Sequence, residues 1–398
     1  MLRTRSVLTR AGAACLTFAV LSIGAIAPSP AADKAPVNVG IIYSKTGLLG
    51  IYGTEYLEGF QIGLDYATHG TGAAAGHKIV VSDRDDAGDP AKAVAAGKDL
   101  IGQGYKILAG STASGVALQM APLAKENNVL FISGAAAADA ITGNNRNTFR
   151  SGRQTYQDVL TAGTMIGTTV RGKKVDVFAQ DSAFGQANVG AVRAVLGANG
   201  AEVSGVLAPL STNDFTPFAQ KIKDAKPDLL FIAWAGTTGG SMFKSLDDGG
   251  VFAATRTVTG LDQRASYVTY APMASRLQFL SHYFYQASHT KANAFLIAAL
   301  KKQGKLPEIF SNDGFVAAQM IVHAIEKADG DDVAKTIPAL EGWSFEGPKG
   351  KQLIRAADHA MIQPMFVTKL EGSGASLEPK LLRTVPEGAV APPLRPFK

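Results

Sequence analysis

The chain of 398 residues contains one cysteine, Cys15, and only one long apolar stretch, which lies at its N-terminus. A single cysteine cannot form an intrachain disulfide, so a fold held together by disulfides is excluded. After the N-terminal stretch, no apolar run approaches the ~18 residues that a membrane-spanning helix needs. We therefore expect the remainder of the chain to fold as a water-soluble α/β protein, stabilised by its own hydrophobic cores.

The N-terminal stretch predicts a secretory signal peptide over residues 1–32. Three arginines stand within its first ten residues, Ala11–Ala27 is apolar or small, and Pro28–Ala32 is turn-prone. We expect cleavage near Ala31 or Ala32. Removal of three arginines lowers the formal charge from +6 to +3 and also removes the cysteine. The mature chain is thus predicted to be exported.

The chain also lacks the patterns of several functional classes. A charge of +3 without any block of five like charges argues against a nucleic-acid partner. None of the six histidines is paired at i, i+4, and the chain contains no G-x-G-x-x-G, P-loop or G-x-S-x-G motif. The aspartate-rich segment SDRDDAGDP has no glutamate at the spacing of a calcium loop, so turns and helix caps account for it. We predict no metal, no cofactor and no catalytic residue.

Strands and helices alternate twice along the predicted mature chain. The first series runs from Val37 to the polar segment Asn147–Thr155, and the second begins at Val175. Such alternation predicts parallel sheets covered by helices on both faces. The expected fold is α/β, with two Rossmann-like lobes joined by a hinge of several crossings. Their expected bounds are 33–153 plus 285–340 for the N-terminal lobe and 154–284 plus 341–398 for the C-terminal lobe.

The stretch Ile107–Ala137 predicts a strand, a Ser/Gly-rich turn, a helix and a second strand. Ser114 precedes the apolar helical stripe and is expected to be its N-cap. A helix start at the carboxyl end of a strand suits a carboxylate or phosphate ligand. The alternative is that Ser114 only caps its own helix.

Several segments, in their joint order, resemble the periplasmic solute-binding proteins of ABC importers. The segments are GIIYSKTGLLGIYG, SDRDDAGDPAKAV, GSTASG, FAQDSAFGQ, DFTPFAQKIKDAKPDLLFIA, and FEGPKG followed by RAADH. The resemblance is to the branched-chain amino acid (Leu/Ile/Val) class with the type I periplasmic fold, and it covers essentially the whole mature chain. It implies a receptor that closes on a small ligand and delivers it to a membrane permease.

The resemblance also implies a set of ligand-binding positions. Hydroxyl and backbone groups near the Ser turn would hold a carboxylate, aromatic side chains would wall the site, and an acidic residue would receive an ammonium group. The implied residues are Ser114, Ala135, Ala137, Tyr52, Phe184, Trp234 and Asp262. Ala137 stands where family members often carry a hydroxyl side chain, so this chain must replace that group.

Alternatives remain open for some of these residues and for the function. Asp262 could be a solvated turn residue, Trp234 could be a core residue, and Arg150 and Arg153 could either reach the ligand or brace the hinge. We expect a monomeric, non-enzymatic receptor for an amino acid with an apolar or aromatic side chain, or for a related small carboxylate. A ligand-sensing receptor partner and a two-lobed exported enzyme are the alternatives.

Overall fold

The computed structural model describes residues 34–167 and 169–397, so the predicted signal peptide lies outside the described residues. Its first sheet has six strands in the order β2-β3-β1-β4-β5-β6. Their bounds are β1 (Lys34–Tyr43), β2 (Ala73–Ala74), β3 (His77–Asp85), β4 (Ile107–Gly110), β5 (Leu130–Ser133) and β6 (Thr148–Arg150). Only β2 pairs antiparallel, so the other five strands end at one common edge.

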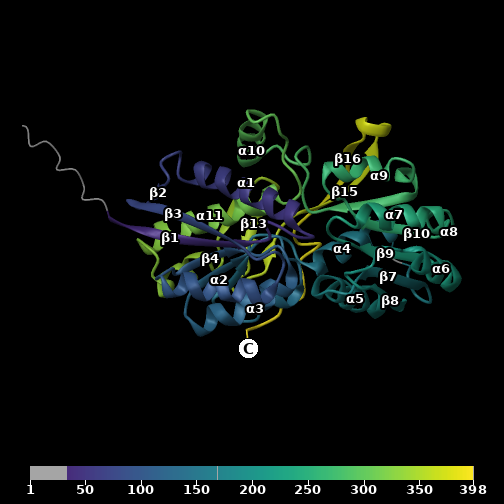
Figure 1. Ribbon diagram of the computed structural model, residues 1–398, viewed down its shortest axis with the longest axis horizontal. Helices are drawn as coiled ribbons and strands as arrows, with labels where there is room; N and C mark the ends of the chain where they lie inside the picture. Colours follow the sequence, from purple (N-terminus) through teal and green to yellow (C-terminus); the bar gives the residue numbers. More distant parts are fainter. Residues whose placement is uncertain (1–33, 168, 398) are drawn as a thin grey trace, which may run out of the picture. The chain divides into compact units, whose positions relative to one another are not determined.

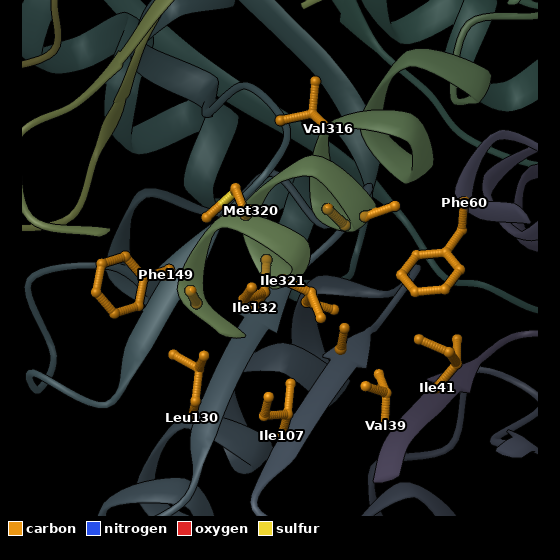
Figure 2. Close-up of a cluster of buried hydrophobic side chains, with 14 of the residues drawn as sticks. Val39, Ile41, Phe60, Ile107, Leu130, Ile132, Phe149, Val316, Met320 and Ile321 are labelled. Atoms are coloured by element: carbon orange, nitrogen blue, oxygen red, sulfur yellow. The ribbon is translucent and has the colours of Figure 1, made fainter. Parts of the chain in front are cut away.

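Helices cover both faces of this sheet because apolar side chains of its strands alternate between the two faces. The covering helices are α1 (Gly50–Ala67), α2 (Pro90–Gly102), α3 (Ser114–Glu126) and α11 (Ser311–Ala328). Ile107 and Leu130 point to the core beneath α1 and α11, where Met320 packs against them (Figure 2). Leu108 and Phe131 point to the opposite core, under α2 and α3.

The second sheet has seven strands in the order β16-β15-β11-β10-β9-β7-β8 (Figure 1). Their bounds are β7 (Lys174–Gln180), β8 (Glu202–Ala208), β9 (Leu229–Ala233), β10 (Arg256–Gly260), β11 (Leu277–Ser281), β15 (Met365–Glu371) and β16 (Glu378–Val385). β7 to β11 are parallel, whereas β15 and β16 extend the sheet antiparallel. The prediction of two predominantly parallel sheets is confirmed.

Both faces of the second sheet are also covered. One core contains Phe178, Leu230 and Phe279 together with side chains of α6 to α8, and the opposite core contains Val177 and Phe231 together with side chains of α4 and α5. The helices are α4 (Thr155–Ile166), α5 (Ala183–Val195), α6 (Thr216–Ala225), α7 (Gly239–Asp248), α8 (Val251–Ala254) and α9 (Tyr267–Tyr270).

The segment after β11 returns to the first sheet, as expected for a multi-crossing chain. It forms α10 (Lys291–Lys301), α11, α12 (Val333–Leu340) and a three-stranded sheet of β12 (Ser344–Gly347), β13 (Gly350–Ile354) and β14 (Met361–Ile362). Ile354 and Met361 are buried in the same core as β1 and α11. The lobe bounds remain a prediction, but this packing favours moving the last boundary from residue 341 toward Met365.

Several elements differ from their predicted form. The sequence predicts a return crossing between the lobes over residues 277–285, but residues 277–281 form β11 of the second sheet, so the crossing begins only after them. The sequence predicts one last strand over residues 361–370, but the structure has two strands there, β14 and β15. The strands β6 and β16 have no counterpart among the predicted elements. Within the part of the chain that the structure describes, no helix has both the length and the apolar character needed to cross a membrane.

Candidate functional site

A cavity of about 560 Å³ lies where the carboxyl ends of strands from both sheets meet. This is the expected location for a ligand in open α/β sheets, because loops there are free of strand pairing and helix starts point toward them. All seven residues implied by the resemblance line it: Tyr52, Ser114, Ala135, Ala137, Phe184, Trp234 and Asp262. The structure therefore brings together residues that are up to 210 positions apart in the sequence.

Ser114 is buried in the cavity wall, but it is not the N-cap that the sequence predicted. Ala113 occupies that position, and Ser114 is the first residue of α3. The Ser114 Oγ instead accepts hydrogen bonds from the backbone N–H groups of Ala137 (3.3 Å) and Ala138 (3.1 Å). Since a hydroxyl can donate while it accepts, its proton remains available to a ligand acceptor.

The alanine segment after β5 forms the adjoining wall. Ala135 and Ala137 are buried, and their backbone groups are held from several sides. The Ala135 carbonyl accepts from Arg153 Nη1 at 3.2 Å, and the Ala137 carbonyl accepts from the Thr155 N–H at 2.9 Å. This wall is a backbone surface with small side chains, so position 137 contributes no side-chain hydroxyl to the cavity.

The side chains of Tyr52, on helix α1, and Asp262, which follows β10 of the second sheet, contact each other. The Tyr52 hydroxyl donates to Asp262 Oδ1 at 2.9 Å and accepts from the Gly236 N–H at 3.0 Å. Ser266 Oγ donates to the other carboxylate oxygen at 2.7 Å. Burial raises the pKa of Asp262, while the hydrogen bonds from Ser266, Gln263 and Tyr52 oppose that rise.

Asp262 makes no ion pair with any residue in the described ranges. Its hydroxyl donors satisfy part of the carboxylate, but they bring no positive charge. Asp262 is half-buried, and a carboxylate partly removed from water without a cation is costly, so a ligand ammonium would supply the missing charge. The geometry therefore favours the pocket role over the alternative of a solvated turn aspartate.

Aromatic side chains give the cavity its apolar walls. The Ser182 side chain caps α5 by accepting from the Gly185 N–H, which places Phe184 in the first turn after β7. Trp234 follows β9 directly and packs against Phe178 and Phe215, each with ring centroids 5.2 Å away. Trp234 thus packs against the core that contains Phe178 and also lines the cavity, and its role toward a ligand stays a prediction.

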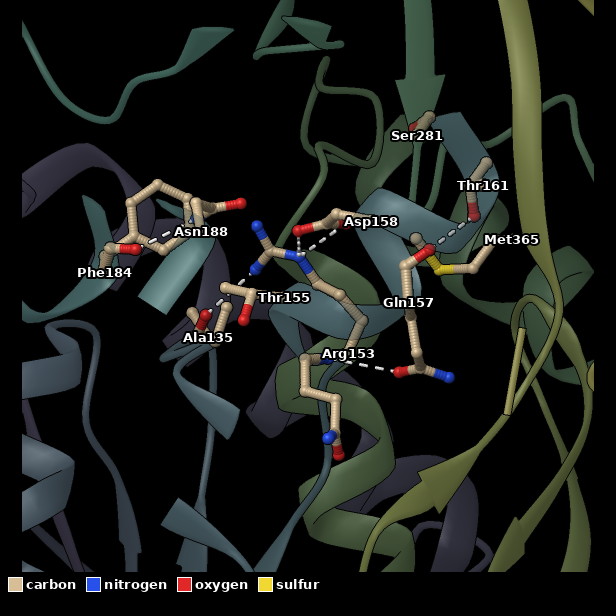
Figure 3. Close-up of polar contacts among 12 residues, drawn as sticks. Ala135, Arg153, Thr155, Gln157, Asp158, Thr161, Phe184, Asn188, Ser281 and Met365 are labelled. Carbon is tan, nitrogen blue, oxygen red and sulfur yellow. Dashed lines mark hydrogen bonds and ion pairs between the residues drawn. The ribbon is translucent and has the colours of Figure 1, made fainter. Parts of the chain in front are cut away.

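Arg150 and Arg153 have different surroundings in the structure. Arg150 is fully buried and donates to Thr142 Oγ1 and to the backbone carbonyls of Ala138 and Arg153, so it braces the crossing. Arg153 lines the cavity. Its guanidinium contacts the Asp158 carboxylate (Nε to Oδ2, 3.3 Å) and donates to Ala135 (Figure 3).

Two further lining residues, His282 and Phe310, were not predicted. His282 follows the carboxyl end of β11, and Phe310 precedes α11. Their ring centroids are 5.1 Å apart, and Phe310 lies 4.8 Å from the Tyr52 ring. Burial lowers the pKa of His282 well below its ordinary value, and the nearby charges of Arg153 and Lys349 lower it further. The one signal for them in the sequence is their position next to predicted element ends.

The aspartates of SDRDDAGDP serve as turn and cap residues. Asp85 Oδ1 accepts from the backbone N–H groups of Lys45, Thr46 and Ala87, and Asp89 caps α2. Among the residues that the structure describes, no group of three or more His, Cys, Asp or Glu side chains is arranged to hold a metal.

Comparisons with known proteins agree with this geometry. A family described as periplasmic binding protein matches residues 36–375. A Leu/Ile/Val-binding protein homolog of Brucella melitensis is 26% identical over 312 residues, which are 78% of this chain and 84% of the relative.

Solved structures extend the likeness. An ABC-type branched-chain amino acid transporter structure from Rhodopseudomonas palustris is 32% identical, with a TM-score of 0.76, and the match covers 91% of this chain and all of the other. A solute-binding protein of an ABC transporter from the same species, solved with p-hydroxybenzoic acid, is 25% identical, with a TM-score of 0.79, 90% coverage of this chain and full coverage of that chain.

Proposed function

The chain belongs to the periplasmic binding protein family, and from that premise we propose that it captures a small carboxylate for an ABC importer. The favoured ligand is an α-amino acid with an apolar or aromatic side chain. The protein acts in the periplasm as a monomeric receptor, without a cofactor and without catalysis, and it delivers the ligand to a membrane permease. The relatives named above, which include an amino acid transporter and a hydroxybenzoate-binding protein, support a carboxylate but leave its class open.

The observation that carries the proposal is the opposed polarity of the cavity. On the side of the first sheet, Ser114 can donate its hydroxyl proton, and the first N–H groups of α3 lie beside it without intrahelical partners. On the side of the second sheet, Asp262 presents a carboxylate that lacks a cation. A zwitterion matches both ends, because its carboxylate meets donors and its ammonium meets an acceptor.

The charge of the cavity supports an amino acid over a simple aromatic acid. Apart from tyrosines, the ionisable side chains of the lining are Arg153, Asp158, Asp262 and His282. Arg153 and Asp158 form an ion pair, and the lowered pKa of His282 favours its neutral ring, so Asp262 is the acid of the lining that has no cation beside it. A simple carboxylate would bring a second negative charge into this lining, whereas a zwitterion would not.

Isothermal titration of the mature protein, freed of co-purified ligand by unfolding and refolding, tests the proposal. We expect L-leucine or L-phenylalanine to bind at one site per chain, and the matched des-amino acids 4-methylpentanoate and 3-phenylpropionate to bind at least tenfold more weakly. Equal affinities within a matched pair would remove the ammonium site, and a ligand set confined to benzoates would assign the cavity to aromatic acids.

A further inference from the structure

Gln180 is a polar residue of the cavity wall that the contacts described so far leave unused. It is the last residue of β7, it lines the cavity, and it is buried, with 3% of its surface exposed. Its Oε1 atom accepts a hydrogen bond from the Ala235 N–H at 3.1 Å. Because an N–H group can only donate, this bond identifies the oxygen end of the amide, and Nε2 is the end that remains.

The Nε2 atom of Gln180 carries two hydrogens that the described part of the chain does not use. It makes no hydrogen bond to another described residue, and it is not among the unpaired side-chain atoms that are fully buried. The small surface that Gln180 retains therefore includes this nitrogen and lies at the cavity. Unpaired donors are costly where little water reaches them, so this amide indicates a ligand atom that accepts hydrogen bonds.

The proposed ligand has few atoms that can meet this donor. Its ammonium group donates only, and an apolar side chain has no acceptor. The carboxylate oxygens are therefore the acceptors that an amino acid with an apolar side chain offers to Gln180. This step rests on the proposed function, because it takes the ligand class from there.

The packing of two helices connects Gln180 to the side of the cavity where Ser114 lies. Gln180 stands three residues before the first residue of α5. Ala187 of α5 packs against a buried cluster that contains Ala117 of α3 and Ala138. Ser114 begins α3, and its Oγ accepts from the Ala138 N–H at 3.1 Å. The starts of α3 and α5 therefore approach the cavity together, one from each sheet.

We propose that Gln180 is a specificity-determining residue that donates from Nε2 to the ligand carboxylate, from the side opposite Ser114. The carboxylate then accepts hydrogen bonds from residues of both sheets. Neither side alone supplies the full set of donors, so the carboxylate itself favours the arrangement in which the two sides enclose the ligand. A ligand without a carboxylate loses this contribution as well as the bond to Ser114.

An isosteric substitution tests the donor. Gln180→Glu keeps an oxygen for the Ala235 N–H and replaces the Nε2 donor with an anionic oxygen. At pH 8 we expect the affinity for L-leucine and L-phenylalanine to fall about thirtyfold or more, because a charge-assisted bond is lost and two carboxylates then repel each other. Gln186→Glu is the matched control, because Gln186 is exposed on the same helix α5 and lies outside the cavity lining. The control should change affinity by less than about twofold.

The pH dependence of the loss separates recognition from a structural role. A carboxyl group at position 180 can donate to the ligand carboxylate once it is protonated, and the nearby negative charge favours that protonation. The affinity of Gln180→Glu, divided by that of the unmodified protein, should therefore rise at least tenfold between pH 8 and pH 5. A ratio that is low at both pH values would assign Gln180 to packing alone and overturn the inference.

A second substitution keeps the test decisive if Gln180→Glu does not fold. Gln180→Met has a similar length and no donor at any pH, so it should lose about tenfold or more in affinity at both pH 8 and pH 5. Full affinity in a folded Gln180→Met or Gln180→Glu protein would overturn the inference and leave the carboxylate receptor intact. Failure of the unmodified protein to bind amino acids or other small carboxylates would overturn the proposed function together with it.

Discussion

Substitution of Ser114 tests the anion side of the cavity in two ways at once. Ser114 Oγ holds two buried backbone N–H groups, those of Ala137 and Ala138, at 3.3 and 3.1 Å. Ser114→Ala removes this acceptor, and because both bonds are long we expect a loss of about 1–2 kcal/mol in the free energy of unfolding. A hydroxyl that also donates to a ligand carboxylate forms a charge-assisted bond worth about 1.5–3 kcal/mol, so ligand affinity should fall roughly 10- to 150-fold.

The two effects are measured separately, by urea unfolding of the ligand-free protein and by calorimetric titration of the folded protein. Ser133→Ala is the matched control, because its Oγ is buried without a partner among the described residues and does not line the cavity. The control should leave affinity unchanged and should not lower stability, because it removes a buried hydroxyl that has no partner. If Ser114→Ala lowers stability but leaves affinity unchanged, the hydroxyl only supports the alanine segment and the carboxylate site is wrongly placed.

Three further predictions follow from the same cavity. Burial raises the pKa of Asp262, so the folded ligand-free protein binds that proton more tightly than the unfolded chain does, and this contribution to stability is lost as the pH rises through the raised pKa. Asp262→Asn should therefore leave the melting temperature of the ligand-free protein at pH 7 unchanged or higher. Affinity for the amino acid should fall roughly thirty-fold, about 2 kcal/mol, while affinity for the des-amino analogue should not fall. Equal losses of affinity for both ligands would exclude an ammonium partner. Gly236 has φ +84°, and a Cβ there would lie 2.6 Å from the Leu48 carbonyl oxygen, so Gly236→Ala should weaken ligand binding. Gly239→Ala should not weaken it, because a Cβ at position 239 has space. Equal effects of the two substitutions would contradict the steric argument. Small-angle scattering should show a smaller radius of gyration at saturating ligand, and an unchanged radius with confirmed binding would count against closure of the lobes.

The sequence predicted the fold well because the fold depends on periodic burial. Strands such as Ile107–Gly110 and Leu130–Ser133 are short, apolar and bounded by turn residues, and their alternation with helices determines a parallel sheet. The strands at the edges of the sheets were predicted less well. β16 carries mainly exposed side chains, so no apolar pattern marked it, and its pairing with β15 depends on tertiary context.

The site was predicted in part, for an equally physical reason. Ser114 stands next to an element end, where a parallel sheet places its ligands, so the pattern along the chain indicated it, whereas Tyr52 and Asp262 were implied only by the family resemblance. The partner of a side chain is not encoded locally. Ser114 was expected to cap its own helix, but its Oγ accepts hydrogen bonds from the backbone N–H groups of Ala137 and Ala138, which lie 23 and 24 residues further along the chain.

No pattern in the sequence marks His282, because its place in the cavity wall depends on the packing of Phe310 against its ring. Arg150 and Arg153 were equivalent in the sequence, three residues apart, and only the fold directs one into the core and the other into the cavity.

A crystal structure of the mature protein with its tightest-binding amino acid tests the central claim most directly. The account predicts one ligand in the cavity between the two sheets, with a carboxylate oxygen about 3 Å from Ser114 Oγ and the ammonium within hydrogen-bonding distance of Asp262. A ligand bound elsewhere on the chain, or one held in the cavity with its carboxylate away from Ser114 and its ammonium away from Asp262, would contradict it.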